Sequence, residues 1–178
     1  MKFLILGIGN IMFADEGLGV HLCKLLEKNY KFSHSNGYIL DFVDGGTLAL
    51  QLSYIIAKYD KVIILDCISA DDSNIGEVFF FPYCAMPNKI KWSGSAHEVE
   101  MLQTLQYMEI LGDLPETRIL ACIPKRIEQM SFAISDEIIK STQIMEKILL
   151  NFLKEEGFSY IKIADYSLQE LANISYKN

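Results

Sequence analysis

The sequence is short of basic residues and has no long apolar run. Lys and Arg number 16 against 23 Asp and Glu in 178 residues, which gives a formal net charge of −7. Nucleic acids are bound by basic faces, so this balance argues against a nucleic-acid partner. The apolar opening, residues 1–8, is too short to span a membrane, and no cleavage site of small residues follows it. We therefore expect neither nucleic-acid binding nor membrane insertion.

Cysteine is also scarce. The 4 cysteines, Cys23, Cys67, Cys84 and Cys122, are widely spaced and form no CxxC pair. This spacing excludes a disulfide framework and a zinc knuckle, and it is typical of reduced, mostly buried thiols. We expect a cytoplasmic protein.

Apolar runs alternate with segments of helical periodicity, which is typical of an α/β fold. Residues 1–157 are expected to form a single α/β domain, followed by a tail, residues 158–178. In this tail Phe158, Tyr160, Ile161 and Ile163 could add a short strand, and residues 168–174 a helical turn. The predicted strands are residues 2–7, 38–43, 61–65, 77–81 and 118–123.

Helical segments between these strands predict a doubly wound, mainly parallel five-stranded twisted sheet with helices on both faces. The third and fourth strands are joined without a helix, so one edge strand should be antiparallel. In such sheets ligands bind beyond the carboxyl ends of the strands, and a functional site is expected there.

Polar residues before the helical segments are candidate caps. We expect Asp15, Thr47 and Ser135 to cap the first, second and last helices. Ser95 and Glu98 have the spacing of a capping box, which predicts the start of the third helix.

The first strand ends in Gly7-Ile8-Gly9-Asn10. A dinucleotide-binding loop needs a third glycine where Met12 stands, and a phosphate loop needs a following Gly-Lys-Ser/Thr, so neither is present. The glycines alone are equally typical of a tight turn.

Several polar residues fall at the predicted strand ends. Asp15-Glu16-Gly17 opens the first helix, Asp44-Gly45-Gly46-Thr47 ends the second strand, and Asp66 ends the third. A carboxylate directly after an apolar strand is costly to bury unless something compensates its charge. Consecutive glycines also allow close approach of another chain, such as an extended peptide.

His97 is expected in the first turn of a helix, where the positive end of the dipole favours the neutral, metal-binding ring. His21 and His34 lack such a setting, and we interpret them as a helix flank and a loop residue. Glu16, Asp66 and His97 together would suit zinc, nickel or a similar ion with open positions. Residues 97–101 are not HExxH, so a helical zincin mechanism is excluded.

These motifs, in this order and spacing over residues 1–155, resemble the nickel–iron hydrogenase maturation endopeptidases. The resemblance rests on Gly7-x-Gly9-Asn10, Asp15-Glu16-Gly17-x-Gly19-Val20, Asp44-Gly45-Gly46-Thr47, Leu65-Asp66 and Ser95-x-His97.

The resemblance implies an α/β endopeptidase that removes a C-terminal extension from the precursor of the hydrogenase large subunit after nickel has been installed. It implies that Glu16, Asp66 and His97 are metal ligands, and that the nickel is presented by the substrate as a readiness signal. Zinc, cadmium or a similar divalent ion would fit the same ligands in a crystal. Asp44, Gly45, Gly46 and Thr47 would bind the substrate strand.

The hydrolytic step stays open. The metal could activate the carbonyl or a water molecule, or Asp15 or Asp44 could act as general base. No Ser or Cys with a partnered base is evident, which argues against covalent catalysis. The alternatives are a metal-sensing checkpoint or chaperone that binds the precursor without cutting it, and a nucleotide-binding oxidoreductase, which Met12 argues against. We expect a monomer.

Overall fold

The structure, a computed structural model, describes the backbone of residues 1–91 and 96–175, and the side chains of residues 1–90 and 99–175. The predicted capping box therefore lies outside the described side chains. The strands are β1 (Lys2–Ile8), β2 (Tyr30–His34), β3 (Ile39–Gly46), β4 (Lys61–Cys67), β5 (Ser69–Ala70), β6 (Val78–Pro82), β7 (Ile90–Lys91), β8 (Glu116–Cys122) and β9 (Phe158–Lys162). The helices are α1 (Leu18–Asn29), α2 (Ser53–Ile56), α3 (Ala96–Leu111), α4 (Asp136–Glu155) and α5 (Leu168–Ser175), with 3-10 turns η1 (Ala14–Gly17), η2 (Leu50–Leu52) and η3 (Tyr83–Ala85).

The central sheet has five strands in the order β3-β1-β4-β8-β6. The pairs that join β3, β1, β4 and β8 are parallel, and β6 is antiparallel to β8 at the edge. The predicted fold class, including the antiparallel edge strand, is confirmed. The carboxyl ends of the four parallel strands therefore lie at one edge of the sheet.

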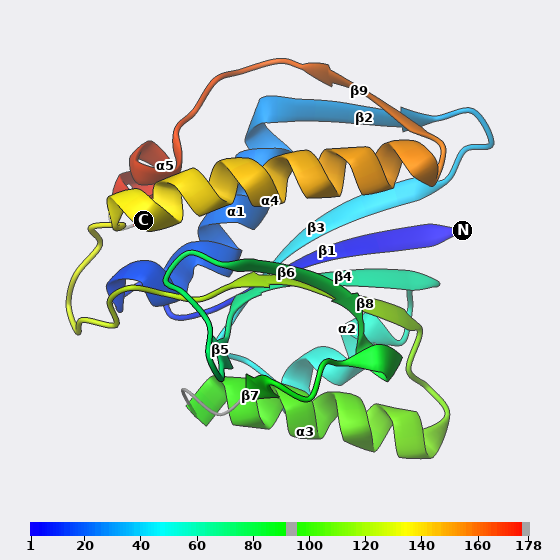
Figure 1. The fold of residues 1–178 in the computed structure, drawn as a ribbon. Coiled ribbons are helices and arrows are strands. Elements are labelled where there is room, and N and C mark those ends of the chain that lie inside the picture. The colour runs from blue at the N-terminus through cyan, green and yellow to red at the C-terminus, as the bar shows by residue number, and fades with distance from the viewer. Residues whose placement is uncertain (92–95, 176–178) are drawn as a thin grey trace.

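Two apolar cores cover the two faces of this sheet. Side chains alternate along β1, so Phe3 and Ile5 join the core beneath α1 and α4, while Leu4 and Leu6 join the core beneath α2 and α3. Figure 1 shows α1, α4 and α5 on one side of the sheet, and α2 and α3 on the other. Among residues 1–91 and 96–175, no helix has both the length and the apolar character needed to cross a membrane.

The strand β2 was not predicted, and the interpretation of His34 as a loop residue is wrong. β2 pairs antiparallel with β9, so each strand needs the other to satisfy its backbone groups. Residues 158–175 also pack on the core, since Phe158 is 3% exposed and its ring meets Phe3 edge-on at 5.0 Å. Because the two strands are far apart in the sequence, periodicity around residue 30 alone did not reveal the pairing.

Two predicted caps are wrong. The N-cap of α1 is Gly17, not Asp15, because the 3-10 turn η1 precedes the helix. The segment after Thr47 forms only η2 and the one-turn α2, whose N-caps are Ala49 and Leu52, with no side-chain cap bond at either. Ser135 does occupy the N-cap position of α4, but its side chain makes no cap hydrogen bond.

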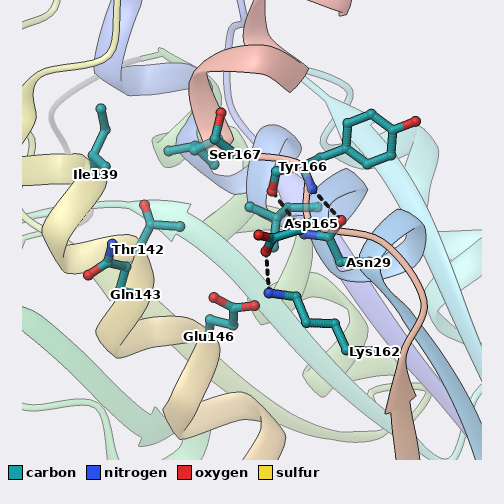
Figure 2. A pocket seen from close by; sticks show the side chains of 11 residues that line it. Asn29, Ile139, Thr142, Gln143, Glu146, Lys162, Asp165, Tyr166 and Ser167 are labelled. Carbon is teal, nitrogen blue, oxygen red and sulfur yellow. Dashed lines mark hydrogen bonds and ion pairs between the residues drawn. The ribbon is translucent and has the colours of Figure 1, made fainter.

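A cavity of about 280 Å³ lies beneath the C-terminal segment, between α1, α4 and residues 162–168. Figure 2 shows polar side chains from all three parts around it, including Glu146, Lys162 and Asp165. The amide of Asn29 holds the segment in place, donating to the Tyr166 carbonyl at 2.9 Å and accepting from the Tyr166 amide at 2.8 Å. These contacts fasten the chain end to α1, on the α4 side of the sheet.

Candidate active site at the strand ends

The glycines after β1 permit very close backbone packing. A Cβ on Gly9, which has φ +135°, would lie 2.0 Å from the Glu16 carbonyl oxygen. A Cβ on Gly19 would lie 2.1 Å from the Leu65 carbonyl oxygen and 2.2 Å from that of Ile8. No side chain fits at either position. The glycines therefore let η1 and the start of α1 press directly against the ends of β1 and β4.

Asp15 joins two distant loops instead of capping α1. Its side chain is fully buried and accepts hydrogen bonds from the amides of Lys125, Arg126 and Ser135 at 3.2, 2.9 and 2.7 Å. It also accepts from the Ser135 hydroxyl at 2.7 Å. Multiple N–H donors compensate the desolvation of a buried carboxylate. Asp15 thus fixes the loop before α4 against the first loop.

Glu16 and Asp66 lie on segments that touch. Glu16 is 3% exposed in η1, and Asp66 is fully buried as the penultimate residue of β4. The Cys67 thiol donates to the Asp15 carbonyl at 3.1 Å, which joins the end of β4 to η1. The two acids predicted as metal ligands are therefore brought to the same corner of the sheet edge.

The carboxylate of Asp66 is oriented by its own strand end. One oxygen accepts the Cys67 amide at 2.8 Å. This bond fixes the side chain close to the backbone, since it spans adjacent residues. The sequence placed Asp66 directly after the strand, whereas β4 continues through it to Cys67.

His97 occupies the first turn of α3, but its side chain lies outside the described residues. Among the described side chains, no three His, Cys, Asp or Glu residues gather as a metal-binding group. The three-residue site thus stays a prediction, with two members placed and the third undescribed.

The segment Asp44–Thr47 divides into an inward and an outward part. Gly45 is buried, and a Cβ there would lie 2.7 Å from Ile8 Cδ1, so this glycine faces the core. Gly46 has φ +53° and only the Asp44 carboxylate within 4 Å of an added Cβ, at 3.9 Å. The Asp44 side chain is 41% exposed and forms an ion pair with Lys24 at 2.8 Å.

His21 is not a helix flank but is fully buried on α1. Neither ring nitrogen has a hydrogen-bond partner within the described part of the chain, and a Cβ on Gly17 would lie 2.9 Å from Nε2. Burial lowers the pKa of the ring to about 4, with the charge of Lys24 acting in the same direction and Asp44 against it. The signal was present in the sequence, because His21 shares the apolar stripe of Leu18 and Leu25.

Comparison with known proteins identifies the family. Residues 20–152 match the family model described as hydrogenase maturation protease. The chain is 45% identical over 159 residues to protein HydD of Wolinella succinogenes, covering 89% of this chain and 99% of that one. It is 27% identical over 129 residues to the hydrogenase 2 maturation protease of Escherichia coli K12, covering 72% and 76% of the two chains.

Solved structures share the fold. The hydrogenase maturating endopeptidase HybD from Escherichia coli superposes with a TM-score of 0.79 at 24% identity, covering 93% of this chain and 100% of that one. The HybD maturation protease from Thermococcus kodakarensis gives a TM-score of 0.65 at 24% identity, covering 85% and 99%. With the family match spanning most of the sequence, the chain belongs to the hydrogenase maturation protease family and is a hydrogenase maturation endopeptidase.

Proposed function

We propose that this endopeptidase removes the C-terminal extension from the nickel-loaded precursor of a nickel–iron hydrogenase large subunit, and that the precursor's nickel is its recognition signal. One observation carries the proposal. Two buried carboxylates, Glu16 and Asp66, stand on touching segments at the carboxyl edge of the sheet, in a member of the maturation protease family.

Glu16, Asp66 and His97 would bind the nickel while it remains part of the substrate. Carboxylate oxygens and an imidazole nitrogen suit a borderline divalent ion such as nickel. The positive charge of the ion would attract the two buried carboxylates, an attraction that an empty precursor cannot provide. The same contact with nickel would then both bind the precursor and report that its nickel has been installed.

The outward part of the Asp44–Thr47 segment would bind the substrate chain. β3 is an edge strand of the sheet, Asp44 and Thr47 are exposed, and Gly46 leaves open space. An extended peptide can lie close to such a backbone. Because Gly45 faces the core, its contribution would be to position this segment.

Asp44 is better placed than Asp15 to act as general base. The acceptor oxygens of Asp15 are occupied by four donors in a fully buried setting. The Asp44 side chain is 41% exposed on the segment proposed to bind the substrate chain, so its carboxylate is accessible to a bound peptide. The metal would contribute by polarising the scissile carbonyl.

We also propose a cytoplasmic location and a monomeric working state. The location is supported by Cys23, Cys67 and Cys122, which are buried and not joined in disulfides. Light scattering during size-exclusion chromatography tests the oligomeric state.

The deciding experiment is a processing assay with matched nickel-loaded and nickel-free precursor. Intact mass should show a shorter large subunit only with the loaded precursor. Adding a divalent ion to the protease alone should not rescue cleavage of the empty precursor. Equal cleavage of both precursors would contradict nickel recognition, and no cleavage of the loaded precursor would contradict the proposed substrate.

A further inference from the structure

A groove of about 560 Å³ lies between η2 and α3, lined by Leu50, Glu100, Gln103, Thr104 and Tyr107. The turn η2 and the short helix α2 pack against α3 on the sheet face opposite α1 and α4 (Figure 1). This groove is separate from the cavity of Figure 2, which lies on the α4 side of the sheet.

The groove is apolar at its walls and carries one charge. Leu50 and Tyr107 are 62% and 54% exposed, which is unusual for large apolar side chains facing a hollow. Thr104 is buried, and its hydroxyl already donates to the Glu100 carbonyl at 2.8 Å. Glu100 is the only charged residue among the described lining residues.

Both walls of the groove are close in sequence to residues of the proposed active site. Leu50 follows the Asp44–Thr47 segment by a few residues, and α3 begins at Ala96, beside position 97. Glu100, Thr104 and Tyr107, which line the groove, have the spacing of one helical stripe on α3. A peptide bound along residues 44–47 would reach the groove through Leu50 of η2.

We propose that this groove binds the extended segment of the precursor that flanks the scissile bond. A bulky apolar side chain of that segment would lie between Leu50 and Tyr107, and a basic side chain would pair with Glu100. The inference rests on the proposed function, since it takes the precursor as the substrate. Its charge preference agrees with the net charge of −7 on the chain.

The test compares steady-state cleavage of nickel-loaded precursor by Leu50→Ala, Tyr107→Ala and the matched control Ile161→Ala. Ile161 is 61% exposed on β9, away from the groove. Truncating either groove residue should raise KM about tenfold while kcat stays within about twofold, because uniform binding is lost. The control should keep both constants.

A charge swap tests the role of Glu100. Glu100→Lys should raise KM, whereas the control Glu155→Lys, with the same charge change at the end of α4, should not. Changing one basic residue of the flanking segment to Glu in the precursor should restore the KM of Glu100→Lys.

Failure of the groove and failure of the proposed function give different results. If the wild-type protein cuts the loaded precursor but the groove variants match Ile161→Ala, the docking site is overturned and the proposed function stands. If Glu100→Lys has a normal KM, or a raised KM that no substrate position rescues, the charge pairing is overturned. If the wild-type protein does not cut, the proposed function itself is overturned.

Discussion

Two regions of the molecule contain carboxylates in opposite environments. At the strand ends, in η1 and β4, the carboxylates are buried, whereas in the C-terminal segment, residues 162–168, they are exposed. Asp15, Glu16 and Asp66 are at most 3% exposed, and the chain around them is packed through glycines. The side chain of Asp165 is 88% exposed and pairs with Lys162, which is 48% exposed. Exposed pairs contribute little to stability, whereas buried acids must be compensated. Asp15 is compensated by four donors, and Asp66 accepts the Cys67 amide. Stability at the strand ends should therefore depend on particular hydrogen bonds, whereas at the C-terminal segment it should not.

The largest difference in stability between the two regions is expected for substitution of Gly19. In Gly19→Ala the new Cβ would overlap backbone oxygens of Leu65 and Ile8, and backbone cannot move aside cheaply. We expect a loss of about 4 kcal/mol or more in the free energy of unfolding, measured by urea denaturation.

The matched control for Gly19 is Gly157 in the C-terminal region. Gly157 has φ +91°, but a Cβ there would meet Nε2 of His34 at 2.7 Å, the movable end of a side chain. Gly157→Ala should cost about 1–2 kcal/mol, mainly from the left-handed backbone. An equal loss in the free energy of unfolding for Gly19→Ala and Gly157→Ala would contradict the proposed difference in packing.

Asp15→Ala should cost about 3 kcal/mol, because it removes the buried carboxylate that accepts the amides of Lys125, Arg126 and Ser135. Urea denaturation again provides the measurement. The control Asp165→Ala removes only an exposed pair and should leave the denaturation midpoint unchanged. A stable Asp15→Ala variant would show that the loop before α4 does not depend on this carboxylate.

The isosteric changes Glu16→Gln and Asp66→Asn test the metal role. Each should lower cleavage of loaded precursor by about 100-fold, because an amide is a poor nickel ligand, while the far-ultraviolet circular dichroism stays native. The control variant Asp165→Asn should cleave the loaded precursor at the wild-type rate. Normal cleavage by either strand-end variant would exclude that residue as a ligand.

His21 predicts a pH dependence of stability. Its pKa falls from 6.5 to about 4 on folding, so the unfolded chain binds the proton first as pH drops. This contribution is fully present above pH 6.5 and is lost between pH 6.5 and 4. Between pH 7 and 5 it amounts to about 2 kcal/mol.

The His21→Gln variant should lack this part of the pH dependence. Urea denaturation of both proteins at pH 7, 6 and 5 provides the comparison. Parallel curves for the wild-type protein and the variant would show that His21 does not titrate on unfolding.

The apolar runs were enough to predict the central sheet and the ends of its strands. Continuous apolar runs such as residues 61–65 can be buried on both faces only in a covered sheet, so β1, β3, β4, β6 and β8 were all predicted to within a few residues. Since parallel strands end at one edge, Glu16 and Asp66 could be assigned to that edge without coordinates.

The contacts that these residues make became clear only from the packed chain. Asp15 was expected to cap its own helix, but its donors come from a loop more than a hundred residues away. The strand β2 forms through β9, and the groove needs η2 and α3 side by side. Local sequence patterns predict which residues are buried and where the chain turns. They do not predict contacts between residues far apart in the sequence, because these form only when the chain packs.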